Sequence, residues 1–125
     1  GTGVRSFTPL GIALACGTTF VARTFGGDSN GTARVLCEAI EHPGFSFIEV
    51  LSPCIIYHPE QRQWKKMVHP REGEPQTDRA LAAKELLSDD GFTTGVFFRS
   101  DYPPYKPDVG KATASLADIE KEFAV

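Results

Sequence analysis

The segment from His42 to Cys54, HPGFSFIEVLSPC, constrains the fold more than any other part of the chain. Within it, residues 45–51 are rich in β-branched and aromatic side chains, which is typical of a buried strand. Residues 18–25 have a similar composition and predict another strand. Residues 31–41, between the two, carry apolar side chains at helical spacing. This order predicts a βαβ unit with parallel strands and a right-handed crossover, and hence an α/β fold.

Boundary residues predict where the first two helices begin. Thr8 followed by Pro9 is a typical helix start, and we expect this helix to end at Gly17. Ser29 or Asn30 is the expected cap of the helix between the two strands. The face of that helix expected to pack on the sheet carries Ala33, Leu36, Ala39 and Ile40.

The chain changes character after the second strand. Residues 55–76 contain three prolines and several charges without a sustained period. They predict an excursion over the surface, with a short helical turn at residues 61–67. Thr77 or Asp78 is the expected cap of a further helix, which ends near residues 88–91.

The last part of the chain predicts a third strand or extended edge segment at residues 93–100. Prolines in residues 102–107 favour a polyproline-like stretch, and Ser115 is the expected cap of a final amphipathic helix. We therefore predict one partial domain. Its parallel-sheet βαβ core occupies residues 1–54, and the proline-rich excursion and carboxy-terminal helices occupy residues 55–125.

Composition excludes several classes of function. The chain has 125 residues, 41% of them apolar, which suits one hydrophobic core. Its formal net charge is -3, so nucleic acid is not an expected partner. No apolar run approaches the roughly 20 residues that span a bilayer, so no membrane partner is expected either. We expect reduced thiols in a cytoplasmic protein, with Cys16 and Cys37 buried on helices that face the sheet.

Cys54 is the strongest single candidate for chemistry. It follows Ser-Pro at the end of a strand, and ligands gather at the carboxyl ends of strands in open α/β sheets. A buried, unreactive thiol is the alternative and, from position alone, the commoner outcome. No second Cys or His lies at CxxC spacing, so co-ligands of Cys54 would lie outside this sequence.

Other polar groups have weaker claims. Residues 26–28, Gly-Gly-Asp, lie between a strand and a helix and could hold a phosphate. They lack the glycine pattern and lysine of known phosphate loops, which favours a plain turn. Trp64 is expected to anchor the excursion, with a contact surface for a protein partner at residues 57–69 as the alternative. We expect all three histidines, His42, His58 and His69, to be exposed loop residues.

Four stretches resemble the beta subunit of 2-oxoacid:ferredoxin oxidoreductases, in particular the 2-oxoglutarate synthase type. They are TPLGIALACGTTFVARTFGGD, AIEHPGFSFIEVLSPC, WKKMVH and DDGFTTGVFFRSDYPPY, which are spread over most of the chain. The resemblance implies that this chain is the carboxy-terminal part of such a subunit, within a thiamine-diphosphate-binding fold. It also implies that Cys54 is the last of the four cysteine ligands of a [4Fe-4S] cluster.

In that family the beta subunit binds thiamine diphosphate, magnesium and the cluster, and acts with an alpha and in some cases a gamma subunit. The complex decarboxylates a 2-oxoacid, transfers the acyl group to coenzyme A and passes two electrons to ferredoxin. The family's Gly-Asp-Gly motif, magnesium segment and amino-terminal cysteine pair have no counterpart here. We therefore expect no cofactor and no activity in the isolated chain. A stand-alone α/β module that binds an anion at residues 26–31, or a protein, is the alternative.

Overall fold

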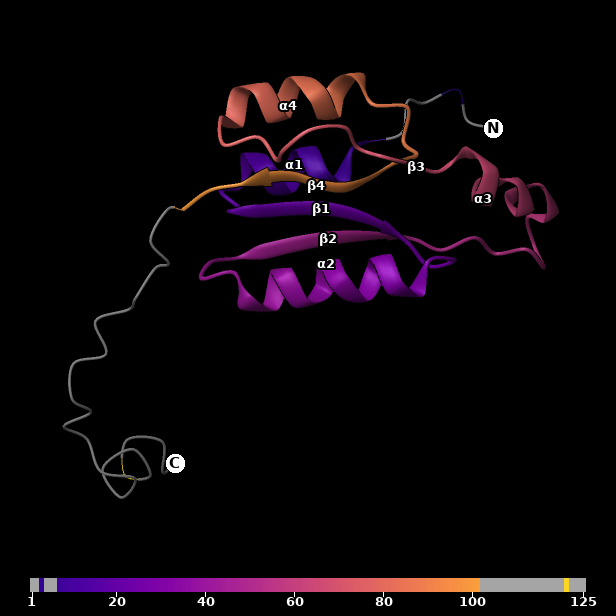
Figure 1. Cartoon of the computed structure of the whole chain (residues 1–125), viewed down its shortest axis with the longest axis horizontal. Coiled ribbons are helices and arrows are strands. Elements are labelled where there is room, and N and C mark those ends of the chain that lie inside the picture. Colours follow the sequence, from indigo (N-terminus) through magenta and orange to yellow (C-terminus); the bar gives the residue numbers. More distant parts are fainter. Residues whose placement is uncertain (1–2, 4–6, 102–120, 122–125) are drawn as a thin grey trace.

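The computed structural model describes residue 3, residues 7–101 and residue 121. Its helices are α1 (Pro9–Ala15), α2 (Ser29–Glu41), the short 3-10 helix η1 (Pro59–Gln63), α3 (Trp64–Met67) and α4 (Arg79–Ser88). Its strands are β1 (Phe20–Phe25), β2 (Ser46–Leu51), β3 (His69–Pro70) and β4 (Thr93–Arg99). Helices α1 and α4 cover one face of the sheet and α2 covers the other, as Figure 1 shows. Among the described residues, no helix is long and apolar enough to cross a membrane.

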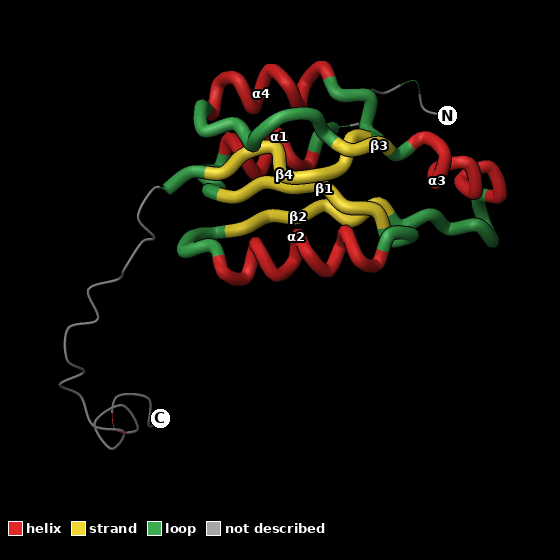
Figure 2. Tube along the Cα trace, in the orientation of Figure 1, coloured by secondary structure: helices red, strands yellow, loops and turns green. Residues whose placement is uncertain are grey.

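The four strands form one mixed sheet in the order β2-β1-β4-β3. Strands β1 and β2 are parallel, from Phe20 opposite Ser46 to Phe25 opposite Leu51, and α2 connects them. The predicted βαβ unit and the α/β class are therefore confirmed. Strand β4 lies on the other side of β1 and runs antiparallel to it, while the two-residue β3 pairs in parallel with β4 (Figure 2). The third strand of the prediction thus lies inside the sheet rather than at its edge.

The core lies on both sides of β1, all six residues of which are buried. Successive side chains of a strand point to opposite faces. Against α1 and α4 the buried cluster comprises Leu10, Leu14, Val21, Ala82, Leu86, Phe97 and Phe98. Against α2 the cluster is smaller and comprises Phe20, Ala22, Val35 and Ala39.

Of the four residues that we predicted on the packed face of helix α2, Ala39 is buried and the other three are exposed. Val35 and Ala39 are buried, whereas Leu36 and Ile40 are 41% and 83% exposed and Ala33 is exposed as well. The sequence places apolar side chains around more than half of this helix. Their spacing alone cannot tell which part of that surface the sheet covers.

The caps explain where two helices begin. Asp28, rather than Ser29 or Asn30, caps α2, because its Oδ1 accepts a hydrogen bond from the Gly31 N–H at 3.0 Å. A Cβ at Gly31 would lie 2.2 Å from Asp28 Oδ2, so a larger residue there would displace the capping carboxylate. Asp78 caps α4 in the same way, as predicted, by accepting from two amides of the first turn.

Helix α1 begins at Pro9, directly after Thr8, as predicted, although the Thr8 side chain makes no capping hydrogen bond. Beyond its last residue the chain turns at Gly17, whose φ of 92° favours glycine. The stretch predicted at residues 102–107 and the helix predicted to start at Ser115 lie outside the described residues.

Candidate functional site

Cys54 lies in the loop that follows β2, at the carboxyl end of the two parallel strands, where the sequence predicts it. The residue is exposed. Two hydrogen bonds to its backbone hold the loop: the Cys54 N–H donates to Gln61 Oε1 at 2.7 Å, and the Cys54 carbonyl accepts from the His58 N–H at 2.8 Å. The main chain is therefore fixed while the thiol lies at the surface.

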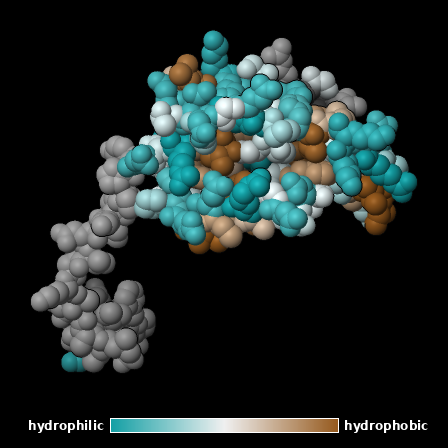
Figure 3. Space-filling view, in the orientation of Figure 1, coloured by the Kyte–Doolittle hydropathy of each residue, from teal (hydrophilic) through white to brown (hydrophobic). Residues whose placement is uncertain are grey.

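The residues directly after Cys54 leave large apolar side chains in solvent. Ile55, Ile56 and Tyr57 are all exposed. Figure 3 shows hydrophobic residues gathered at the end of the molecule that this loop forms. Contiguous apolar surface of this kind usually marks a site that another polypeptide covers.

The described residues do not by themselves fit an iron-sulfur cluster. A [4Fe-4S] cluster is held by four ligands, commonly thiolates. Within the described residues no group of three or more His, Cys, Asp or Glu side chains could hold a metal ion. Cys16, at the end of α1, and Cys37, on α2, belong to helices on opposite faces of the sheet. The described residues therefore do not bring together the ligands of a cluster.

The prediction that Cys16 and Cys37 are buried is wrong, because both are exposed free thiols. Cys16 is the residue directly after the end of α1, whose packed face carries Leu10 and Leu14. Cys37 lies on the side of α2 that faces away from its buried residues, Val35 and Ala39. Both positions follow from which side of each helix the sheet covers.

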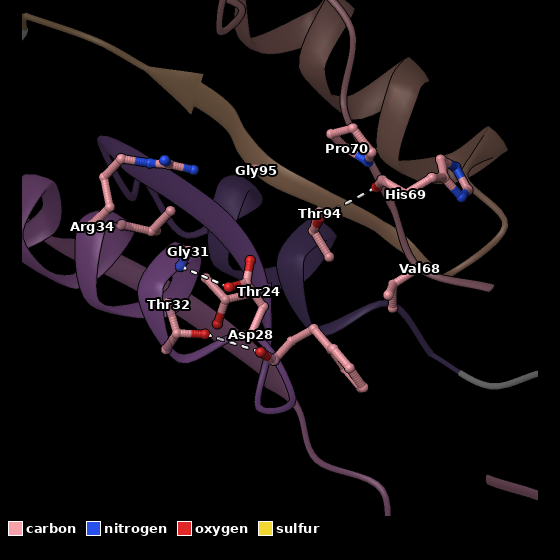
Figure 4. A pocket seen from close by; sticks show the side chains of 12 residues that line it. Thr24, Asp28, Gly31, Thr32, Arg34, Val68, His69, Pro70, Thr94 and Gly95 are labelled. Carbon is pink, nitrogen blue, oxygen red and sulfur yellow. Dashed lines mark hydrogen bonds between the residues drawn. The ribbon is translucent and has the colours of Figure 1, made fainter. Parts of the chain in front are cut away.

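A cavity of about 330 Å³ lies at the carboxyl end of β1. Figure 4 shows Asp28 and Arg34 on one side of it and Val68 and Pro70 on the other. Most polar groups of its wall are already bonded. The Thr32 hydroxyl donates to the Phe25 carbonyl at 3.1 Å, the Thr94 hydroxyl donates to the His69 carbonyl at 3.2 Å, and Asp28 caps α2.

Two polar groups of the wall have no bonding partner among the residues that the structure describes. Thr24 Oγ1 is buried without a hydrogen-bond partner, and Arg34 makes no ion pair with any residue that the structure describes. The turn before α2 is closed by the Asp28 N–H, which donates to the Phe25 carbonyl at 2.9 Å. The Asp28 carboxylate occupies the start of the helix, where a phosphate would bind. Residues 26–28 thus form the tight turn that the sequence favours.

His42 is not the exposed loop residue that we predicted, because it is only 6% exposed. Its Nε2 lies 2.9 Å from Thr19 Oγ1, and that hydroxyl donates to the Phe45 carbonyl at 3.2 Å. The hydroxyl must then accept from the ring, so Nε2 carries the proton. Burial, assisted by the positive charge of Arg99, lowers the pKa of His42 below its ordinary value of 6.5. His42 is thus a neutral, structural residue.

In the excursion, His58 and His69 are exposed as predicted, but His69 belongs to strand β3 and not to a loop. Trp64 packs edge-on against Phe92, with ring centroids 5.7 Å apart, and so anchors the excursion beside the start of β4 as expected.

Sequence reasoning missed a buried ionic cluster centred on Arg23 of β1. Arg23 is 4% exposed, its Nε lies 2.6 Å from Glu49 Oε2 on β2, and it also bonds to Asp89, the residue after α4. Burial alone would raise the pKa of Asp89, but hydrogen bonds from Thr93 and Arg23 outweigh it and lower that pKa. The signal in the sequence was an arginine inside an apolar strand, since a buried guanidinium requires carboxylate partners.

Comparison with known proteins gives relatives of one kind. No model of a protein family matches the chain. The 2-oxoacid:ferredoxin oxidoreductase subunit beta of Saccharolobus solfataricus is 30% identical over 83 residues, which are 65% of this chain and 27% of that subunit. The 2-oxoglutarate oxidoreductase subunit KorB of Mycobacterium tuberculosis is 32% identical over 76 residues, which are 55% of this chain and 20% of that protein. The resemblance to the beta subunit of 2-oxoacid:ferredoxin oxidoreductases is confirmed.

The fold agrees with that of a solved structure of the same kind. The 2-oxoglutarate:ferredoxin oxidoreductase from Magnetococcus marinus, with 2-oxoglutarate, coenzyme A and succinyl-CoA bound, superposes with a TM-score of 0.72 at 24% identity. The superposition covers 98% of this chain and 41% of that chain. This chain therefore spans well under two thirds of the length of the oxidoreductase chains that it resembles.

Proposed function

We propose that this chain is part of the beta subunit of a 2-oxoacid:ferredoxin oxidoreductase. The observation that carries the proposal is its similarity to beta subunits of such enzymes from two organisms. We further propose 2-oxoglutarate as the substrate, because both KorB and the Magnetococcus marinus enzyme carry that substrate in their names.

The reaction that we propose for the whole complex converts a 2-oxoacid, coenzyme A and two oxidised ferredoxins to acyl-CoA, carbon dioxide, a proton and two reduced ferredoxins. Thiamine diphosphate and magnesium would be bound by the parent subunit, and an alpha subunit, with or without a gamma subunit, would complete the active site. The described residues hold three separate thiols and no group of three or more metal ligands, so we expect the isolated chain to be inactive. We propose a cytoplasmic location for the complex.

We propose that the Cys54 thiolate is one of the four ligands of a [4Fe-4S] cluster, which transfers electrons singly toward ferredoxin. Two features of the loop support this role. The residue is exposed on a backbone that hydrogen bonds hold in place, and the next three residues are apolar and uncovered. The remaining ligands would come from polypeptide outside this chain.

The test uses the complete polypeptide that the gene encodes, produced together with its alpha subunit. Ferredoxin reduction should require both 2-oxoglutarate and coenzyme A. Cys54→Ser should lower the iron content and the visible absorbance of the cluster and abolish ferredoxin reduction, whereas Cys16→Ser should change neither. A full iron content in the Cys54→Ser protein would show that Cys54 is not a ligand.

A stand-alone binding module remains the second candidate, and the cavity beside Thr24 and Arg34 is the observation that favours it. It predicts that the assembled protein binds a small carboxylate or phosphate without reducing ferredoxin. Arg34→Gln should then weaken that binding. If the complete complex reduces ferredoxin with 2-oxoglutarate, this candidate is wrong.

A further inference from the structure

The two short helices of the excursion form a basic end of the molecule. Helices η1 and α3 lie beyond one end of the sheet, as Figure 1 shows. Arg62 lies in the last turn of η1, and Lys65 and Lys66 lie in α3. We call these three residues the basic cluster. Residues 55–68 contain them and one acidic side chain, whereas the whole chain has a formal net charge of -3. Positive charge is thus concentrated at one end of a chain that is acidic as a whole.

The charges of the basic cluster are exposed and unpaired. All three side chains are exposed, and none makes an ion pair with a residue that the structure describes. The nearby carboxylate, Glu60, has its Oε1 3.1 Å from Nδ1 of His58. By contrast, Arg71 is held by Glu85 and by two backbone carbonyls. A cation with a structural role in this fold therefore has partners, and the basic cluster has none among the described residues.

The basic cluster is connected to the Cys54 loop and to the sheet. Gln61, in η1, accepts a hydrogen bond from the Cys54 N–H at 2.7 Å, and the His58 N–H donates to the Cys54 carbonyl at 2.8 Å. Trp64, in α3, packs against Phe92, which precedes β4. These contacts fix the position of the cluster on both sides. A molecule that binds the basic cluster is therefore held beside the Cys54 loop.

Apolar side chains beside the basic cluster favour a protein as the bound molecule. Ile56 and Tyr57 are 83% and 82% exposed, and Met67 of α3 is exposed as well. Figure 3 shows hydrophilic and hydrophobic residues side by side at the end of the molecule that η1 and α3 form. Protein interfaces combine apolar and charged groups in this way, whereas binding to nucleic acid depends mainly on charge. The partner that fits this surface is a protein with an acidic face.

We propose that the basic cluster is the docking surface for ferredoxin, which binds there through acidic side chains of its own. This inference rests on the proposed function, which supplies the partner. The names of the related enzymes give ferredoxin as a reactant but assign it no surface. Opposite charges on two surfaces speed their association and fix their relative orientation. Docking at the basic cluster would turn ferredoxin toward the exposed Cys54 loop.

The test uses the complete polypeptide that the gene encodes, assembled with its alpha subunit, and compares two electron acceptors. Ferredoxin must dock, whereas methyl viologen, a small cationic dye, needs no docking surface. The quantity measured is kcat/KM for ferredoxin divided by the rate with methyl viologen. Lys66→Glu should lower this ratio at least about fivefold at about 0.02 M salt. The decrease should become much smaller at about 0.5 M salt, because salt screens exposed charges.

A matched control separates the position of the charge from the total charge. Lys84 of α4 is also exposed and makes no ion pair with a described residue. Lys84→Glu changes the net charge by the same amount as Lys66→Glu, so it should leave the ratio unchanged. An equal decrease in both variants would show that net charge alone governs docking, and the assignment to the basic cluster would be wrong.

Chemical cross-linking locates the contact without turnover. A carbodiimide joins an amine to a carboxylate that touches it through an amide bond. In a mixture of the complex and ferredoxin, mass spectrometry should find Lys65 or Lys66 joined to carboxylates of ferredoxin. This product should disappear at about 0.5 M salt. Cross-links from ferredoxin only to lysines outside the basic cluster would place the docking surface elsewhere and overturn the inference.

Three outcomes distinguish failure of the inference from failure of the proposed function. If the complex reduces both acceptors and Lys66→Glu leaves the ratio unchanged, the inference is wrong and the proposed function stands. If Lys66→Glu releases the alpha subunit on gel filtration, the basic cluster is a contact between subunits and the inference is again wrong. If the complex reduces neither acceptor with 2-oxoglutarate and coenzyme A, the proposed function fails and the inference fails with it.

Discussion

The face of the sheet under α1 and α4 is closed, whereas the face under α2 is only partly covered. Seven buried residues and the Arg23 cluster occupy the first face. Among the described residues, the second face has four buried residues, the cavity, and the exposed apolar side chains of Leu36 and Ile40. We therefore expect most of the stability of the isolated chain to come from the first face.

The largest expected effect is on the closed face, at Arg23. Arg23→Met would leave Glu49 and Asp89 as neighbouring carboxylates without their cation, and breaking a buried ionic cluster in this way costs about 3–5 kcal/mol in the free energy of unfolding. Urea-induced unfolding measures the loss. The matched control is Arg34→Met, an exposed arginine of the α2 face, which should change stability by less than about 0.5 kcal/mol. Equal effects at the two arginines would contradict the comparison.

A pair of leucines tests the same contrast through packing alone. Leu14 of α1 is 1% exposed and belongs to the closed face, so Leu14→Ala should cost about 2–5 kcal/mol. Leu36 of α2 is 41% exposed, so Leu36→Ala should cost less than about 1 kcal/mol in the isolated chain. Unfolding in urea gives both values. A larger loss at Leu36 than at Leu14 would show that the Leu36 side of α2 is already covered, for instance by self-association.

The sequence predicts local elements well because their signals are local. The βαβ unit follows from two strand-like segments around a helical period, and the turn at residues 26–28 from its two glycines. The place of Cys54 just after a strand is predicted in the same way, but its exposure is not, since position alone favours a buried thiol. The types of these segments and the turn depend mainly on neighbouring residues, whereas the exposure of a side chain depends on what packs against it.

The errors concern which parts of the chain meet across the sheet. The wrong face was assigned to α2 because Leu36 and Val35 are equally apolar, and only the sheet decides between them. The antiparallel position of β4 beside β1 leaves no signal in either strand. The ionic cluster joins Arg23 to partners 26 and 66 residues away, a pairing that spacing along one sequence does not reveal.

The smallest expected effect separates the two faces by pH. His42 packs against Phe20 on the α2 face, and its folded-state pKa lies below 6.5. Between 6.5 and that lower value the unfolded chain binds a proton that the folded chain excludes, so stability is complete above pH 6.5 and falls as the pH decreases from there. The slope from one such group is at most about 1.4 kcal/mol per pH unit. Asp89, on the closed face, has its pKa lowered from 3.8, so its contribution to stability is lost only as the pH falls below that value.

Urea unfolding measures this pH dependence. Between about pH 7.5 and about pH 5 the free energy of unfolding should decline. His42→Gln should remove that decline, and a substitution of the exposed His58 should leave it unchanged. A decline of equal slope in the His42→Gln protein would mean that another group carries the proton, and the α2 face would then lose its distinct pH response.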